Sequence, residues 1–264
     1  MNKDRLSPAI LALYELVSKL RGPGGCPWDA QQTDATIKVY LLEEAYEVLD
    51  ALDNGSPDDV CKELGDLLFQ IVFLAKLAEE KMEFDFHDVL ESITEKMKTR
   101  HPHVFGKETL ETPQEVAESW QRIKQQERGK TTPLSAILSD VPSNLPALLR
   151  AHRLGERASS SDVEPWGDDP FVGFQEGFEM LKKSKHDHQE ADIREIIGKL
   201  FFDLAQLTRE QGLNAESLLR DTNQKFIDDV RQGEKDFPSF RAGTTKTTTA
   251  QIRKSLKPIS GKEG

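Results

Sequence analysis

Two pairs of acidic residues on either side of a short chain break constrain the fold of this sequence more than any other feature. Glu44 and Glu47 stand three residues apart. Glu63 and Asp66 repeat this spacing, which places both members of a pair on one helix face. Between them, residues 54–57 read Asn-Gly-Ser-Pro, which ends one helix and begins another. So short a connection makes the helices antiparallel. The two pairs lie at matching distances from the turn, so we expect four carboxylates to converge.

Apolar residues surround both acidic pairs on nearly all sides of the two predicted helices, as in the interior of a bundle. Gathered carboxylates repel one another, and burying them costs solvation free energy. A divalent cation removes this conflict, and Mg²⁺ prefers oxygen ligands and commonly bridges to substrate phosphates. The pattern therefore favours a Mg²⁺ site at Glu44, Glu47, Glu63 and Asp66 over two solvated acidic faces. A di-iron bundle is disfavoured because neither pair contains a Glu-x-x-His motif.

Helical periodicity extends well beyond the acidic pairs, and the first half shows no strand-type alternation. Ser7 and Pro8 predict the start of the first helix. Thr112 and Glu115, with Pro113 between them, predict a capping box at the start of a later one. The predicted helices cover residues 7–20, 37–53, 57–81, 85–100, 113–128, 191–211 and 214–232. We therefore expect an all-α protein.

Segments on both sides of the acidic pairs share the order of a known family. They read Gly-Cys-Pro-Trp-Asp at 25–29, Leu-Glu-Glu-Ala-Tyr-Glu at 42–47, Glu-Leu-Gly-Asp-Leu-Leu-Phe at 63–69 and Arg-His-Pro-His-Val-Phe at 100–105. Their order and spacing resemble the MazG family of nucleoside triphosphate pyrophosphohydrolases over roughly residues 5–130. The resemblance implies four-helix-type bundles and Mg²⁺-dependent hydrolysis of a nucleoside triphosphate to its monophosphate and pyrophosphate. It also implies that such bundles pair into a homodimer.

The same resemblance implies roles for further side chains. Lys96 and Arg100 match positions that contact substrate phosphates, although by spacing alone they are an ordinary solvated pair. Glu43, or one of the four acids, would orient or deprotonate the attacking water. Lys124 is a candidate phosphate contact. Trp120, on the same helix face, is either a base-stacking residue of the nucleotide site or, as is commoner, a core or interface residue.

The second half of the chain repeats the acidic pattern in a degraded form. Glu176 and Glu179 match the first pair, with Gln175 in place of Glu43. The positions that match Glu63 and Asp66 hold Ile196 and Lys199, and a lysine there would compete with a cation. The activity is therefore expected in the N-terminal half.

The repeat predicts two related bundles in one chain. We expect a catalytic MazG-like domain at 1–128, a linker at 129–146, a degenerate second MazG-like domain at 147–236 and a basic, disordered tail at 237–264.

Charge and apolar content narrow the possible partners and compartment. The 264-residue chain carries a net charge of −11, which argues against binding a nucleic-acid polymer. No apolar run is long enough to span a membrane, and the N-terminus lacks a signal-peptide core, so we expect a cytoplasmic protein. Two alternatives to an enzyme remain open. One is a non-catalytic nucleotide sensor or interaction protein, and the other is a metal-stabilised helical scaffold.

Overall fold

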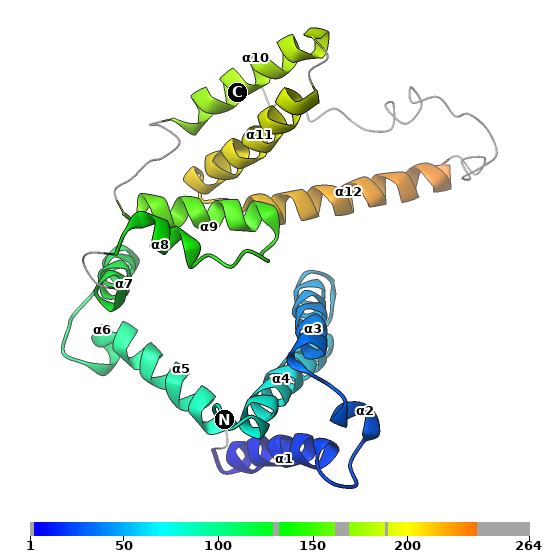
Figure 1. The fold of residues 1–264 in the computed structure, drawn as a ribbon, viewed down its shortest axis with the longest axis vertical. Helices are drawn as coiled ribbons and strands as arrows, with labels where there is room; N and C mark the ends of the chain where they lie inside the picture. The colour runs from blue at the N-terminus through cyan, green and yellow to red at the C-terminus, as the bar shows by residue number, and fades with distance from the viewer. Residues whose placement is uncertain (1–2, 129–131, 162–168, 188–189, 237–264) are drawn as a thin grey trace. The chain divides into compact units, whose positions relative to one another are not determined.

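The computed structural model describes residues 3–128, 132–161, 169–187 and 190–236, and within these ranges it contains twelve α-helices and no strand. The predicted all-α class is confirmed (Figure 1). The helices are α1 (Lys3–Arg21), α2 (Pro27–Ala30), α3 (Asp34–Asn54), α4 (Pro57–Glu80), α5 (Phe86–Arg100), α6 (Pro102–Phe105), α7 (Pro113–Arg128), α8 (Leu134–Ser139), α9 (Ala147–Ser159), α10 (Pro170–Asp187), α11 (Glu190–Glu210) and α12 (Ala215–Asp236). None of these described helices has the length and apolarity needed to cross a membrane.

The chain divides into two compact units, which we call unit 1 (Met1–Ile123) and unit 2 (Lys124–Gly264). The segment 129–146, expected to be a linker, contains the short helix α8. The expected tail at 237–264 lies outside the described residues.

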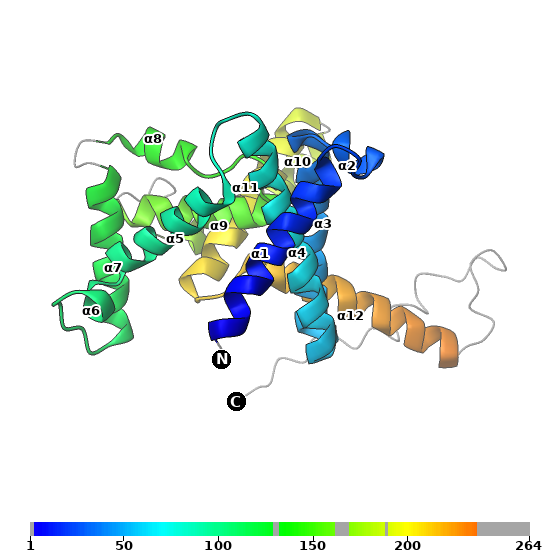
Figure 2. The same cartoon turned by 90° about the horizontal axis from the view of Figure 1, so that it is seen from below.

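Helix α4 is the centre of unit 1, because α1, α3 and α5 all pack against it. Helices α3 and α4 form the antiparallel pair expected from the break at 54–57. Thr33 caps α3, and Ser56 caps α4 in a reciprocal arrangement with Asp59. Both views show α1 crossing α4 (Figure 1, Figure 2). The core beneath this crossing is formed by the side chains of Val17, Ile37, Val72, Phe73, Ala75, Leu77 and Phe86.

The start of α1 differs from the sequence prediction. The helix begins at Lys3 rather than near Ser7, so Pro8 lies inside it. Proline removes a single backbone N–H, and here the lost bond is the one to the carbonyl of Asp4 in the first turn.

Arg21, at the end of α1, connects three segments of unit 1. Its Nη1 donates to the carbonyl oxygens of Asp29 at 2.5 Å and Gln32 at 3.3 Å. Its Nε and Nη2 donate to the two carboxylate oxygens of Glu80 at 2.7 and 2.6 Å. The guanidinium also lies 5.1 Å from the ring centroid of Phe73. This side chain therefore holds α2 and the entry to α3 against the end of α4.

Unit 2 is built around a second antiparallel pair, α10 and α11. Helix α9 packs against α11, and α12 packs against both α9 and α11. Small residues (Ala151, Ala205 and Ala215) allow these helices to approach closely. Gln206 is fully buried, where its Nε2 donates to the Ala151 carbonyl at 2.9 Å and its Oε1 accepts from Nε of Arg209 at 3.0 Å.

Candidate metal centre

The α3–α4 pair brings acidic side chains from both helices together. Glu44, Glu63 and Asp66 each present one carboxylate oxygen, and these three oxygens lie within 4.8 Å of one another. Glu44 and Glu63 are half-buried, whereas Asp66 is exposed. Glu47 lies outside this closest group, but its carboxyl group interacts with that of Glu63. The helical spacing and the short turn therefore bring three of the four expected carboxylates together, with Glu47 next to them.

Burial and neighbouring negative charges shift the pKa values of two carboxyl groups in this cluster. Burial, followed by the charge of Asp66, raises the pKa of Glu44 above its ordinary value. Burial, followed by the charges of Glu47 and Asp66, raises the pKa of Glu63. Both carboxylates thus resist ionisation in the metal-free protein. A hard cation with oxygen ligands would relieve this conflict, so the donor set fits Mg²⁺.

Sequence reasoning missed one polar residue of this cluster. Gln70 follows Asp66 by four residues and Glu63 by seven, so the three share a face of α4. Its Nε2 donates to Oε1 of Glu44 at 3.4 Å, a contact that moderates the raised pKa of Glu44. The spacing was visible in the sequence. However, a single glutamine in an apolar helix gives no signal of burial.

Glu43 is exposed on α3. Consecutive helical residues project about 100° apart, so Glu43 borders the cluster without joining the face that carries Glu44.

The expected phosphate-binding pair is on another helix. Lys96 is exposed and Arg100 half-buried on α5. This helix packs on α4, and Phe86 at its start joins the core. Figure 1 shows the two helices diverging beyond that region.

Trp120 and Lys124 are both half-buried on α7. The Trp120 ring makes an edge contact with the ring of His101, with centroids 5.1 Å apart. His101 ends α5, and its Nδ1 lies 2.7 Å from the carbonyl oxygen of Met97. Trp120 therefore packs against the end of α5. The capping box of Thr112 and Glu115 at the start of α7 is present as predicted.

The position in unit 2 that matches Asp66 is occupied by a lysine, Lys199. Nζ of Lys199 lies 2.7 Å from Oδ2 of Asp203, whose side chain is only 3% exposed. Ile196 is buried. Glu176 and Glu179 are exposed, and Glu179 pairs with Lys182 at 2.6 Å. The described part of unit 2 therefore lacks the carboxylate convergence of unit 1.

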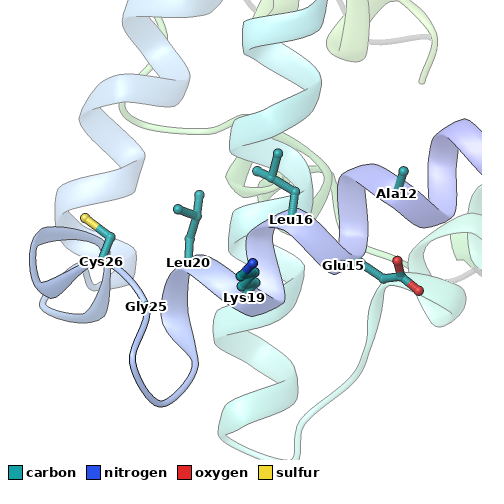
Figure 3. A pocket seen from close by; sticks show the side chains of 7 residues that line it. All are labelled: Ala12, Glu15, Leu16, Lys19, Leu20, Gly25 and Cys26. Atoms are coloured by element: carbon teal, nitrogen blue, oxygen red, sulfur yellow. The ribbon is translucent and has the colours of Figure 1, made fainter.

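A pocket of about 410 Å³ lies elsewhere in unit 1, on α1 and the loop that follows it. Figure 3 shows Leu16, Leu20 and Cys26 projecting from the same side of these segments. None of the four acids lines it. This pocket is separate from the candidate metal centre.

Comparison with known proteins places these features in context. Residues 32–105 match the family described as the MazG nucleotide pyrophosphohydrolase domain. A nucleoside triphosphate pyrophosphohydrolase of Escherichia coli K12 is 40% identical over 227 residues, which cover 84% of this chain and 86% of that protein. A nucleoside triphosphate pyrophosphohydrolase/pyrophosphatase of Thermotoga maritima is 36% identical over 222 residues, 84% of each chain. A solved structure of a mazG-related protein from Thermotoga maritima is 25% identical and covers 43% of this chain and 97% of its own, with a TM-score of 0.38.

Proposed function

Because this chain belongs to the MazG family of nucleoside triphosphate pyrophosphohydrolases, we propose that it hydrolyses a nucleoside triphosphate to the monophosphate and pyrophosphate at a cation site in unit 1. The observation that carries this proposal is the convergence of oxygens from Glu44, Glu63 and Asp66 within 4.8 Å. These three residues belong to the two acidic motifs that lie inside the family match at 32–105.

Four carboxylates, those of Glu44, Glu47, Glu63 and Asp66, are the proposed ligands of Mg²⁺. Their oxygens are the donor type that this cation prefers, and the raised pKa values of Glu44 and Glu63 are a reason for the site to bind one. When bound, Mg²⁺ would neutralise phosphate charge and polarise the bond that breaks.

The remaining groups act on water and phosphate. Glu43 is the proposed base, which takes a proton from the attacking water. The water oxygen bonds to the α phosphorus while the bond from the α phosphorus to the bridging oxygen breaks. The bridging oxygen leaves with pyrophosphate. Lys96 and Arg100 are proposed to bind the phosphates and to stabilise the charge that builds up on this leaving group.

We propose that the active form is a homodimer. Large apolar side chains are exposed along α3, α4 and α5; they include Leu42, Leu49, Leu52, Leu64, Leu68, Ile71, Leu90 and Ile93. Apolar faces of this extent are typical of protein interfaces. Since α5 diverges from α4 within one chain, the second chain is the proposed source of the Lys96 and Arg100 that face a given cation site.

Unit 2 is proposed to be non-catalytic. The Lys199 ammonium, held by the nearly buried Asp203, puts a fixed positive charge at the position that matches Asp66. Such a charge repels a divalent cation, and two acidic ligands are absent from the pattern.

The test is the release of pyrophosphate from each nucleoside triphosphate with and without Mg²⁺. We expect release from the wild type and from the matched control in which Glu176 and Glu179 are both changed to Ala. The Glu63→Gln variant should lose at least about 100-fold in turnover, since one electrostatic group of such a site typically contributes 10²–10³-fold. A wild type that binds the nucleotide but releases no pyrophosphate would favour a nucleotide sensor.

A further inference from the structure

Gln70 is a nearly buried polar side chain inside the acidic cluster, with 8% of its surface exposed. It lies one helical turn beyond Asp66 and two turns beyond Glu63 on the same face of α4. Glutamine is seldom buried to this degree unless both ends of its amide have hydrogen-bond partners.

The two ends of the Gln70 amide differ in their hydrogen bonds. Nε2 donates to Oε1 of Glu44 at 3.4 Å, whereas Oε1 of Gln70 is buried and has no hydrogen-bond partner among the described residues. With Glu44 ionised, as a ligand of a cation must be, reversing the amide would not help, because Oε1 would then face a carboxylate oxygen and neither atom can donate. The contact with Glu44 therefore sets the amide orientation and leaves a buried acceptor beside the acids.

We propose that Gln70 is a positioning residue of the cation site. Its Nε2 donates a hydrogen bond that orients the Glu44 carboxylate. Its Oε1 would accept a hydrogen bond from a water bound to the cation. This inference rests on the proposed function, since it requires the cation. Mg²⁺ bound to proteins usually keeps several waters, and these waters are donors. With the cation in place, both ends of the buried amide have a partner.

The repeated pattern in unit 2 provides independent support. Lys199 matches Asp66, so the residue four positions later, Asp203, matches Gln70. Asp203 is nearly buried and accepts a hydrogen bond from the Lys199 ammonium at 2.7 Å. In unit 2 this helix position therefore holds a buried acceptor that faces a positive group. We infer that Gln70 occupies the equivalent place in unit 1, where the positive group is the hydrated cation.

The test measures binding of Mn²⁺, used as the paramagnetic substitute for Mg²⁺, by electron paramagnetic resonance of the full-length protein without nucleotide. Gln70→Leu should weaken Mn²⁺ affinity by roughly 10- to 100-fold, the usual effect of removing a partner outside the ligand shell. Its metal-free unfolding temperature should not fall, because the change also removes an unpaired buried oxygen. Gln70→Glu keeps an acceptor oxygen, so it should bind Mn²⁺ more tightly than Gln70→Leu.

Two controls separate this inference from the proposed function. Gln206→Leu removes a fully buried glutamine whose amide is satisfied at both ends in unit 2. It should lower the unfolding temperature and leave Mn²⁺ affinity unchanged. Glu63→Gln removes a proposed ligand and should abolish tight binding.

Each outcome has a distinct meaning. Normal Mn²⁺ affinity in Glu63→Gln would overturn the cation site itself. Loss in Glu63→Gln with affinity within twofold of wild type in Gln70→Leu would overturn the role of Gln70 alone. If Gln70→Glu binds Mn²⁺ no more tightly than Gln70→Leu, the acceptor role of Oε1 is refuted.

Discussion

Replacing Arg21 with Leu should destabilise unit 1 strongly, although Arg21 is not part of the candidate metal centre. The side chain is 7% exposed and donates to Glu80 and to two backbone carbonyls. Hydrogen bonds to charged groups contribute about 1.5–3 kcal/mol each, but they are not additive here, and Glu80 is 37% exposed and can be rehydrated. We therefore expect Arg21→Leu to lower the free energy of unfolding by about 3 kcal/mol, near the lower end for a broken buried ion pair.

A matched control is the ion pair between Lys81 and Asp34, which also joins the end of α4 to a neighbouring segment. Its side chains are 43% and 59% exposed, so Lys81→Met should cost no more than about 1 kcal/mol. Hydrogen exchange followed by mass spectrometry on residues 26–32 measures the local effect. A loss of about 3 kcal/mol corresponds to roughly 100-fold faster exchange in this segment. Arg21→Leu should also lower the urea midpoint for the unfolding of unit 1.

The effect of Arg21 should also depend on pH in a defined direction. The hydrogen bond from Arg21 holds the pKa of Glu80 below its ordinary value of 4.5. The stabilisation from this pair is therefore complete above 4.5 and is lost as the pH falls through the lowered pKa. The difference between wild type and Arg21→Leu should shrink in acid. If Arg21→Leu lowers the free energy of unfolding by less than 1 kcal/mol at neutral pH, or if its difference from wild type grows in acid, Arg21 does not stabilise unit 1 in this way.

Three further predictions concern the cation site and the homodimer. Burial and neighbouring charges raise the pKa of Glu44 and Glu63. Without metal, the contribution of these two residues to stability should therefore fall as the pH rises from 4.5 through the raised pKa values. Thermal unfolding measured against pH should show this slope, and either added Mg²⁺ or replacement of both residues with Gln should flatten it. Light scattering should give about twice the 29.8 kDa chain mass. Co-expressed Glu63→Gln and Arg100→Ala chains should recover about a quarter of wild-type turnover, because half of the dimers are mixed and each holds one intact site. No recovery would place Arg100 in the same chain as its acids.

The all-α class and the meeting of the acidic pairs could be predicted from the sequence because both follow from local geometry. Spacings of three residues set the helix faces, and the turn at 54–57 sets the register of α3 against α4. Caps such as that of Thr112 and Glu115 act over three or four residues. The start of α1 differs, because Pro8 was expected at the first turn but lies inside the helix. Helices α9 and α10 were not among the predicted ones.

Only the tertiary structure decided which polar groups are buried and what they contact. Arg21 and Glu80 are 59 residues apart, and Gln70 and Glu44 are 26 apart, so no local spacing relates them. The divergence of α5 from α4 is likewise a feature of the tertiary structure that no local spacing predicts. Helix faces are determined within a few residues of chain, whereas burial and charge compensation depend on where distant helices pack. The chemistry of the candidate centre is therefore visible in the sequence, while the residues that hold it in place appear only in the folded chain.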